Sequence, residues 1–267
     1  MILDTRESQP RLNVQAGELM PASTRVAVVK TSGPDLLFAV PNKTAQWRVD
    51  TFHTKEPETI AWIDRFSRGD LMLDIGANVG TYSVYAAAVA GARVIAFEPE
   101  SQNYALLNEN IFMNRLDDSV RAIPLAVSDD TGIDAFNLSS WGSGGSCHST
   151  GAAIGFNGKA FKPDFVQGAF KVTLDSLSSW FESSAKVHLK VDVDGLEPNV
   201  IAGGEGLLER RAFASVLIEI NHGLNSHLDI LRKMLYWGYR FRPDQVQSSM
   251  RTAGPFIGVA NYVFYSE

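Results

Sequence analysis

The sequence predicts an α/β fold with a mostly parallel central sheet, helices on both faces and a β-rich N-terminal extension. From residue 71 onward, short apolar runs typical of buried strands alternate with longer segments of helical pattern. These intervening segments are long enough for the right-handed crossovers that parallel strands need. The 267 residues, 45% of them hydrophobic, suffice for one α/β domain with additions.

The first 50 residues have a different character. Two β-prone runs, "RVAVVK" and "LLFAV", flank the turn-rich "TSGPD", which favours a β-hairpin. We therefore assign residues 1–50 to an N-terminal β-hairpin extension and residues 51–267 to the main domain. At the junction, "TKEPETIAWIDRF" predicts a helix with Thr54 as its N-cap.

Within the main domain, strands and helices are expected to alternate, with one interruption. Residues 139–160 are rich in glycine and serine, which predicts a flexible loop with a few aromatic anchors. The expected strands are "LMLDIG", "RVIAFEP", "VRAIPLAVS", "VHLKVDVDG", "SVLIEIN" and a closing β segment in "FIGVANYVFYSE"; the expected helices are "TYSVYAAAVA", "SQNYALLNENIFMN", "EPNVIAGGEGLL" and "HLDILRKMLYWGY".

Charge and cysteine content exclude several classes of protein. A net charge of −6 leaves no basic footprint for nucleic acid, so we expect no nucleic-acid partner. The single cysteine, Cys147, excludes an intrachain disulfide and suits a reducing compartment. The N-terminus lacks a signal-peptide pattern, and no apolar run approaches the ~18 residues that span a bilayer. A cytoplasmic location without a transmembrane segment is the expectation.

The stretch "LDIGANVGTY" carries the first chemical signal. Asp74 ends a predicted strand, and Gly76, Asn78 and Gly80 follow in a turn before a helix, with the spacing D-x-G-x-x-x-G. Dinucleotide folds favour G-x-G-x-x-G, where the backbone closes on a pyrophosphate. A carboxylate beside the turn disfavours phosphate and favours a cation. S-adenosyl-L-methionine (SAM) has no phosphate but carries an ammonium and a sulfonium.

Glu98 ends the next predicted strand. An acid at this place accepts hydrogen bonds from ribose hydroxyls in both NAD and SAM sites. Glu98 therefore predicts a ribose, and only the turn indicates which nucleoside is bound.

Several blocks in order resemble the FkbM-type SAM-dependent methyltransferases, a family with the class I, Rossmann-like methyltransferase fold. They are "LMLDIGANVGTYSVYAA", "VIAFEPESQNYALLNENI", "AVSDDTG", "VTLDSL" and "LKVDVDGLEPNVIAGG", and with "VLIEIN" they cover roughly residues 52–221. The chain departs from many members by having Asp194 before the glycine of "DVDG". The first 50 residues and the glycine-rich loop match nothing in the family, which leaves the acceptor open.

The resemblance implies methyl transfer from SAM, usually to a hydroxyl of a small-molecule or glycan acceptor: a sugar, glycoconjugate or natural product. It also implies cofactor contacts along the chain. The methionine part would lie against the turn, the ribose on the second strand and the adenine at the end of the third; the implied residues are Asp74, Gly76, Asn78 and Gly80, then Glu98, then Ser128 and Asp129.

Catalytic candidates come from "HLKVDVDGLE". In a strand, Lys190, Asp192 and Asp194 share one face, and such charges are costly to bury unpartnered. Asp192 is the first candidate, to contact the acceptor or the SAM amine, with Lys190 orienting it or setting its pKa. The alternative is an ordinary Lys190–Asp192 ion pair at a strand end. Glu219, which ends a later strand, is a further catalytic candidate.

The histidines and the possible metal ligands say less about the function. His222 is a weaker candidate for a base, and His188, inside an apolar strand, is expected to be a core residue. We predict no metal site, because the histidines and Cys147 lack metal-ligand spacing. Asp192, Asp194 and Glu219 nevertheless have the oxygen ligands that suit a hard cation.

Two other functions stay open at this stage. An NAD-dependent oxidoreductase would also use Glu98 and a parallel sheet, but the phosphate-binding glycine pattern is missing. A non-catalytic SAM-binding domain would keep the fold without the chemistry. The sequence leaves the oligomeric state undetermined.

Overall fold

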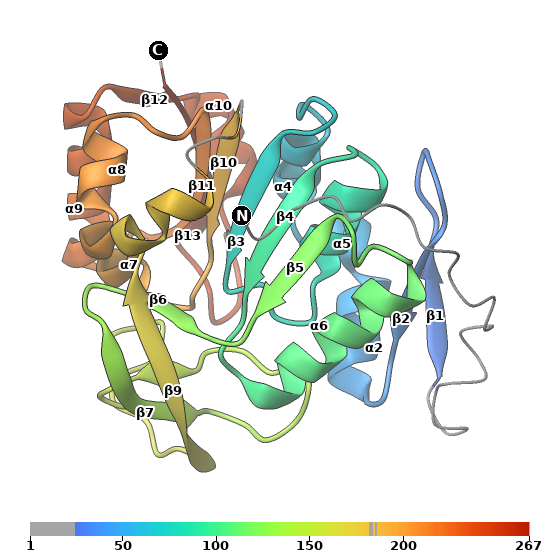
Figure 1. Ribbon diagram of the computed structural model, residues 1–267. Helices are drawn as coiled ribbons and strands as arrows, with labels where there is room; N and C mark the ends of the chain where they lie inside the picture. The colour runs from blue at the N-terminus through green and yellow to red at the C-terminus, as the bar shows by residue number, and fades with distance from the viewer. Residues whose placement is uncertain (1–24, 182–183, 185, 267) are drawn as a thin grey trace.

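The computed structural model of the chain describes residues 25–181, 184 and 186–266. A seven-stranded sheet lies between two groups of helices, and a four-stranded sheet and a hairpin are added to it (Figure 1). The elements of the main sheet are β3 (Leu71–Ile75), β4 (Arg93–Phe97), β5 (Val120–Ile123), β10 (Val187–Val191), β11 (Ser215–Asn221), β12 (Tyr239–Phe241) and β13 (Val259–Ser266). The helices are α2 (Lys43–Asp50), α3 (Phe52–Lys55), α4 (Pro57–Ile63), α5 (Thr81–Ala88), α6 (Ser101–Met113), α7 (Glu197–Gly203), α8 (Glu205–Glu209), α9 (Asn225–Tyr236) and α10 (Pro243–Ser249), with a 3-10 turn η1 (Asp175–Trp180).

The order of the main sheet is β12-β13-β11-β10-β3-β4-β5. Strands β5, β4, β3, β10 and β11 are parallel to one another; β13 pairs antiparallel with β11, and β12 pairs antiparallel with β13 and so runs in the same direction as the other five. The predicted mostly parallel sheet is confirmed. The chain runs outward from β3 through β4 to β5 on one side, and from β10 to β11 on the other. This makes the boundary between β3 and β10 a topological switch point, where open α/β sheets bind ligands beyond the carboxyl ends of their strands.

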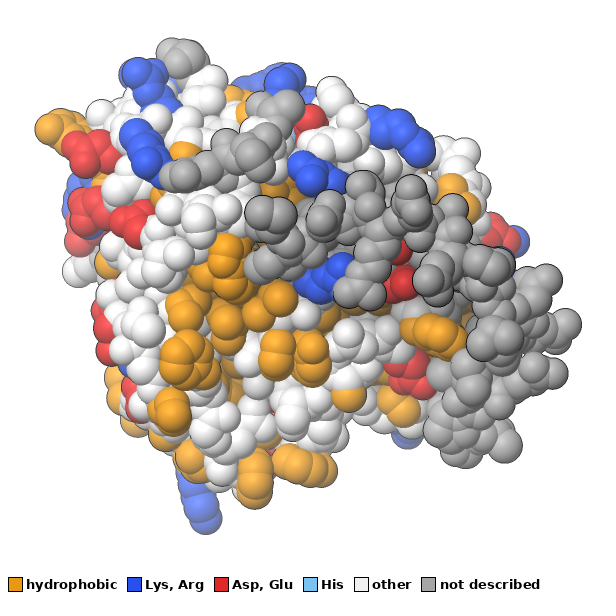
Figure 2. All heavy atoms as spheres, viewed as in Figure 1, with side chains coloured by type: hydrophobic (Ala, Val, Ile, Leu, Met, Phe, Trp, Pro, Cys, Tyr) orange, Lys and Arg blue, Asp and Glu red, His pale blue; other side chains and the backbone are white. Residues whose placement is uncertain are grey.

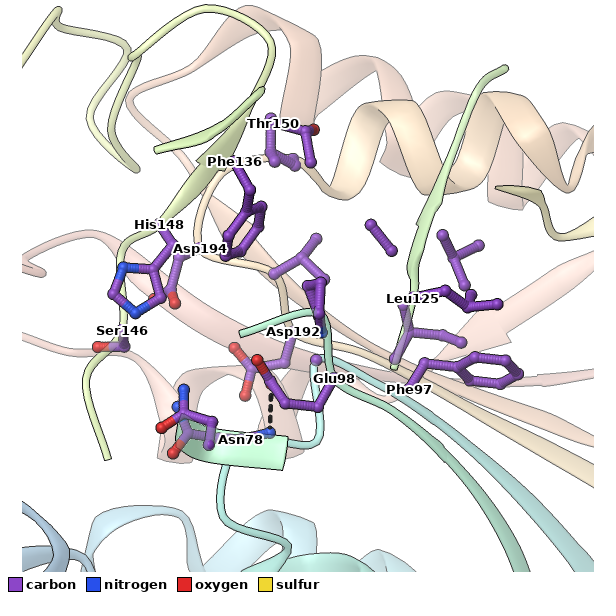
Figure 3. A pocket seen from close by; sticks show the side chains of 18 of the residues that line it. Asn78, Phe97, Glu98, Leu125, Phe136, Ser146, His148, Thr150, Asp192 and Asp194 are labelled. Carbon is purple, nitrogen blue, oxygen red and sulfur yellow. Dashed lines mark hydrogen bonds between the residues drawn. The ribbon is translucent and has the colours of Figure 1, made fainter. Parts of the chain in front are cut away.

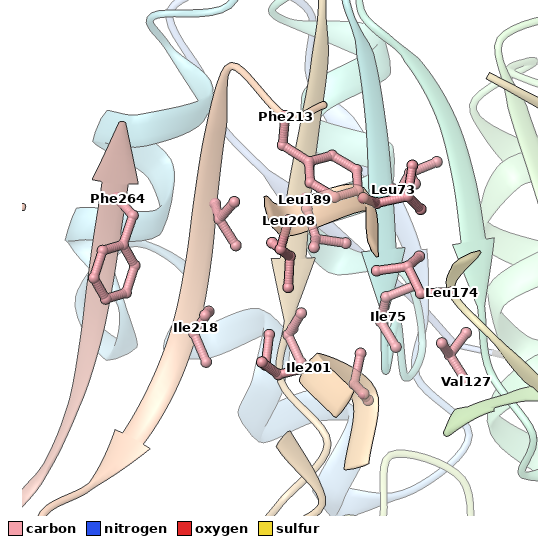
Figure 4. Close-up of a cluster of buried hydrophobic side chains, with 14 of the residues drawn as sticks. Leu73, Ile75, Val127, Leu174, Leu189, Ile201, Leu208, Phe213, Ile218 and Phe264 are labelled. Atoms are coloured by element: carbon pink, nitrogen blue, oxygen red, sulfur yellow. The ribbon is translucent and has the colours of Figure 1, made fainter. Parts of the chain in front are cut away.

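Apolar side chains cover both faces of this sheet, as expected for parallel strands. Leu71, Leu73 and Ile75 of β3 join a cluster with α7, α8 and α9 (Figure 4). Met72 of the same strand joins the opposite cluster, with α2, α4, α5 and α6. The alternation of side chains along β3 therefore serves two cores and fixes the strand's register.

Within the described part of the predicted N-terminal extension, the two β-prone runs form a hairpin, and residues 43–50 form helix α2. Strands β1 (Val26–Val29) and β2 (Leu36–Ala39) pair antiparallel. Asn110 of α6 and Asn114, which caps the end of this helix, accept backbone N–H bonds from Ala39 and Leu37, both at 2.9 Å, which ties the hairpin to the main domain. Residues 1–24 of the predicted extension lie outside the described residues.

Three predicted boundaries were wrong. The helix expected from Thr54 begins at Pro57, because proline suits the first helical position, and Thr54 belongs to α3. The helix expected over "EPNVIAGGEGLL" divides into α7 and α8 at Gly204. The segment "VRAIPLAVS" divides into two strands of different sheets around Pro124, which has no N–H for a central ladder.

The second of those strands, β6 (Ala126–Ser128), opens a four-stranded sheet that the sequence did not predict. Its order is β6-β9-β7-β8, with β7 (Gly132–Leu138), β8 (Ser149–Thr150) and β9 (Phe165–Thr173). Strand β8 lies within the predicted glycine-rich loop. Figure 2 shows hydrophobic side chains on the face that carries β6 and β9. In the described part of the chain, no helix is long and apolar enough to cross a membrane.

Candidate functional site

The turn after β3 is held by close backbone contacts at the switch point. Gly76 has φ +82°, and a Cβ there would lie 2.0 Å from the carbonyl oxygen of Asp192. Gly80 has φ +81°, and its Cβ would lie 2.2 Å from Leu107 of α6. Asn78 also has positive φ, which asparagine tolerates better than most residues. Gly76 is therefore required by packing against a backbone carbonyl as well as by its backbone angle, whereas the Gly80 contact is with the end of a side chain.

Glu98 faces this turn from the end of β4. Its carboxylate accepts N–H bonds from Asn78 at 2.8 Å and from Glu100 at 2.9 Å. Burial raises the pKa of Glu98 to about 7, although the two backbone bonds oppose that shift. Figure 3 shows Glu98 above Asn78 at the rim of a cavity. An acid in this position has oxygen lone pairs left for further hydrogen-bond donors.

The cavity lies at the switch point, between the two sheets. Of the predicted site residues, Gly76, Asn78, Glu98 and Asp192 line it. An apolar wall faces them, formed by Phe97, Leu125, Ala126, Val127 and Phe136. The remaining lining includes Asp194 and the segment with Gly145, Ser146, His148 and Thr150.

The other predicted cofactor residues lie beside the cavity without lining it. Asp74 is buried behind the turn and accepts a hydrogen bond from Ser83 at 2.6 Å. Gly80 begins α5. Ser128 donates to Asp129 at 3.0 Å, and both follow the three residues of this segment that line the cavity, Leu125–Val127.

Of the three charged residues of "KVDVD", Lys190 and Asp192 contact each other, whereas Asp194 has a different partner. Lys190 is buried and lies 3.3 Å from Asp74 and 3.1 Å from Asp192. Burial lowers the pKa of Lys190, but Asp192 and Asp74 outweigh it and raise the pKa above its ordinary value. Burial raises the pKa of Asp192, but Lys190 and Lys55 hold it at about 2. Asp192 is therefore an ionised carboxylate at the cavity wall, and the ion pair considered from sequence is present.

Asp194 is directed to a different partner. It has φ +53°, and its carboxylate accepts the backbone N–H of Cys147 at 2.8 Å and contacts the Cys147 thiol at 3.6 Å. Burial, followed by the charge of Asp194, raises the pKa of Cys147 to about 12. Asp194 therefore holds the glycine-rich segment against the strand edge.

Further acids gather beyond Asp192. Glu197 is fully buried and accepts N–H bonds from Val193 and Gly195, both at 2.9 Å. Glu219 pairs with Arg251 at 3.0 Å. Burial and nearby Asp192 raise the pKa of Glu219 well above its ordinary value, and Arg251 opposes them. One oxygen each of Asp192, Glu197 and Glu219 lies within 4.8 Å of the others, the spacing a cation would need. That the protein has no metal site stays a prediction.

The structure brings in residues that sequence analysis did not identify. Asn103 of α6 bonds the Gly144 N–H at 2.7 Å and the Gly145 carbonyl at 3.1 Å, and Asn78 also donates to Gly145, at 2.7 Å. The segment predicted as a flexible loop is thereby bonded to the turn and to α6. In the sequence, the only sign that this glycine-rich segment is ordered was the presence of aromatic and polar residues among its glycines.

His188 and His222, the two histidines considered from the sequence, lie in different environments. His188 is buried, stacks on Phe66 at 3.9 Å and bonds Ser215 at 2.7 Å, as expected of a core residue. His222 bonds the Tyr262 hydroxyl at 2.9 Å and does not line the cavity.

A family model described as the methyltransferase FkbM domain matches residues 74–241, more than half of the chain. The chain belongs to the FkbM methyltransferase family. This membership decides between the two enzyme classes left open by Glu98, because it makes SAM, and not NAD, the cofactor. The FkbM match ends at the last residue of β12, so it covers the four-stranded sheet and every residue that lines the cavity, and it leaves out β13 of the main sheet.

Solved structures with a related fold are remote in sequence. Precorrin-6y C5,15-methyltransferase from Geobacter metallireducens is 11% identical, with a TM-score of 0.45 over 80% of this chain and 89% of that one. Human methyltransferase 10 domain containing protein is 12% identical, with a TM-score of 0.41 over 85% and 84%. The C-terminal domain of precorrin-6Y C5,15-methyltransferase from Rhodobacter capsulatus is 12% identical, with a TM-score of 0.39 over 83% and 87%. No curated protein matches the FkbM-family chain significantly.

Proposed function

We propose that the chain transfers the methyl group of SAM to a hydroxyl oxygen of a sugar, glycoconjugate or natural product. The observation that carries this proposal is the ionised Asp192 at the wall of the donor cavity, with Glu219 close behind it. Carboxylates accept hydrogen bonds from hydroxyl groups, and a hydroxyl must lose its proton when it is methylated. An acidic edge beside the methyl donor suits such an acceptor.

The donor would lie across the turn and the end of β4. Gly76 lets the turn approach β10 closely, and Asn78 and Glu98 present polar atoms at the same wall. The buried Glu98 carboxylate suits ribose hydroxyls, and the apolar wall of Phe97, Leu125 and Val127 suits a base. The turn lacks the G-x-G-x-x-G spacing that closes on a pyrophosphate, which suits a donor without phosphate.

The Glu98 assignment has a direct test. Glu98→Ala removes charge-assisted hydrogen bonds to the ribose, so we expect S-adenosylhomocysteine to bind at least tenfold more weakly. Isothermal calorimetry measures the dissociation constant, and Glu58→Ala, at a carboxylate outside the cavity lining, is the control. An unchanged dissociation constant in Glu98→Ala would refute the ribose assignment.

SAM supplies an activated methyl group on a sulfur that leaves readily, so the chain's work is positioning and proton transfer. The acceptor oxygen forms the new bond to the methyl carbon, the electrons of the carbon–sulfur bond stay on sulfur, and the hydroxyl proton is released. Asp192 would accept the hydroxyl hydrogen bond and orient the oxygen, while Lys190 keeps Asp192 ionised. Glu219, with an oxygen within 4.8 Å of the Asp192 carboxylate, would receive the proton.

Acceptor screening tests the activity. The purified chain is incubated with SAM and a panel of monosaccharides, glycosides and hydroxylated natural products, and S-adenosylhomocysteine release is measured. Methylation confined to amines or carbon acids would overturn the hydroxyl assignment. Binding of SAM without turnover on any class would favour a non-catalytic SAM-binding domain.

With an acceptor in hand, Asp192→Asn separates chemistry from binding. We expect kcat to fall about 10²-fold or more, with the S-adenosylhomocysteine dissociation constant within a few-fold of the parent. Asp130→Asn, which removes a surface carboxylate paired with Lys171, is the matched control. Unchanged turnover in Asp192→Asn would exclude a role for this carboxylate in the reaction.

A further inference from the structure

Residues 142–147 of the glycine-rich segment, here called the strap, lie across the donor turn. The carbonyl oxygen of Gly145 accepts side-chain N–H bonds from Asn78 of the turn at 2.7 Å and from Asn103 of α6 at 3.1 Å. Gly145 and Ser146 line the donor cavity, and Figure 3 shows Ser146 on the same side of it as Asn78. A nucleoside bound along the turn would therefore lie against the strap.

Hydrogen bonds, and not apolar packing, hold the strap in place. Near its start, the Asn42 side chain donates to the Ser143 carbonyl at 2.9 Å. Nε of Arg48 donates to the Gly144 carbonyl at 2.7 Å, and the bond to Asp194 holds the other end of the strap. Within the described part of the chain, no strap residue belongs to a hydrophobic core cluster. Segments held in this way open at a lower free-energy cost than segments with buried apolar side chains.

Two of these bonds come from the N-terminal extension. Asn42 caps the start of α2 and Arg48 lies in its last turn, and they are 101 and 96 residues from their partners in the strap. Helix α2 is itself fixed, because its Ala45 and Val49 side chains are buried in the core cluster that includes side chains of α5 and α6. The FkbM match begins at residue 74, so a helix outside this match holds one wall of the donor cavity.

We propose that the strap is a gate for the methyl donor and for S-adenosylhomocysteine, and that Asn42 and Arg48 hold this gate closed. The gate opens when the strap's hydrogen bonds break, while the turn and Glu98 stay in place on the main sheet. This inference rests on the donor site of the proposed function and deepens it. It concerns donor exchange alone, so it does not depend on which acceptor is methylated.

A gate has a kinetic consequence that separates it from a binding contact. None of the four residues joined by the two bonds from α2 lines the cavity. Removing one of these bonds therefore favours the open strap to the same extent in the free and in the bound protein. The association and dissociation rate constants of the nucleoside should then rise by the same factor, and Kd should change little. A variant that damages the site itself would instead raise Kd without faster association.

Surface plasmon resonance of the immobilised chain with S-adenosylhomocysteine measures both rate constants. Arg48→Met removes the donor to Gly144, and we expect both rate constants to rise about three- to tenfold, the effect of losing one hydrogen bond. Arg48→Lys keeps an N–H donor and should return both rate constants toward the parent values. Lys43→Met, which removes an exposed cation from the same helix, is the matched control and should change neither rate constant.

Asn42→Asp tests the second bond without loss of the helix cap. An aspartate still accepts the N–H of Ala45, as Asn42 does at 2.8 Å, but it cannot donate to Ser143. Both rate constants should again rise about threefold or more, with the free energy of unfolding in urea close to the parent value. Unchanged rate constants in both folded variants would overturn the proposal, as would weaker binding without faster association. No acceptor takes part, so the hydroxyl assignment is judged separately by the acceptor screen.

Discussion

Replacing Gly76 with alanine measures how tightly the cofactor turn is packed against the end of β10. Its matched control is Gly69→Ala, because the two glycines have nearly the same backbone angle, φ +82° and +86°. A Cβ on Gly69 would have no neighbour within 4 Å, whereas one on Gly76 would lie 2.0 Å from the carbonyl oxygen of Asp192. The pair therefore separates backbone strain from steric overlap.

The magnitudes follow from these contacts. A left-handed alanine costs about 1–2 kcal/mol, and the smaller entropy of the unfolded chain returns about 0.4–1 kcal/mol, so Gly69→Ala should cost about 1 kcal/mol. Cβ contacts under 3.0 Å are essentially never seen, so at Gly76 the turn or β10 must also move by at least about 1 Å. Overpacking of this kind adds about 1–3 kcal/mol, for a total of about 2–4 kcal/mol.

Urea denaturation measures the free energy of unfolding, and calorimetry with S-adenosylhomocysteine measures the effect on the site. Gly76→Ala should also weaken nucleoside binding at least tenfold, because Gly76 and Asp192 both line the cavity. Gly69→Ala should leave binding unchanged. Equal losses of stability in the two variants, or equal nucleoside affinity, would refute the close approach of the turn to β10.

Three further results are expected. Burial raises the pKa of Glu98 from 4.5 to about 7, so between these pH values the folded chain holds a proton that the unfolded chain has lost. The free energy of unfolding should therefore fall as pH rises from 4.5 to 7. Urea denaturation at pH 5 and at pH 8 measures this fall, and Glu98→Gln should reduce it by up to about 3 kcal/mol. Lys190→Met strips the buried Asp74 of its cation and should cost about 3–5 kcal/mol in urea unfolding; a loss under about 1 kcal/mol would contradict the pairing. The pKa of Cys147, raised to about 12 by burial and by Asp194, should slow its alkylation by iodoacetamide at pH 8 at least about a hundredfold against the denatured chain. Equal rates in the folded and denatured chains would contradict the raised pKa.

The parallel sheet and the donor turn were predictable because their signals are local. The run 71–75 is apolar enough for a strand buried on both faces, and the glycines after it are needed where the chain reverses into α5. Glu98 was identified in the same way, from its place at the end of a strand. In each case the residues that carry the signal are neighbours along the chain, so pattern and structure coincide.

The second sheet escaped prediction because two of its four strands are very short and its pairings connect segments that are distant in the sequence. Strand β6 has three residues and β8 has two, too few for a period to be recognised. Pro124 separates β5 from β6, yet one apolar run covers both, so the sequence looked like a single strand. The wall of the cavity that faces the β3 turn depends on this division.

The sequence by itself determined the α/β class, the family and the acids that follow the strands. Only the tertiary structure decided what those acids do: Asp74 turns inward to Lys190, Asp192 stays at the cavity, and Asp194 holds the backbone of Cys147. It also decided that Gly145, 67 residues from Asn78, closes over the same turn. The physical reason is that a charged side chain is directed by the partners that packing brings to it, and those partners come from elsewhere in the chain.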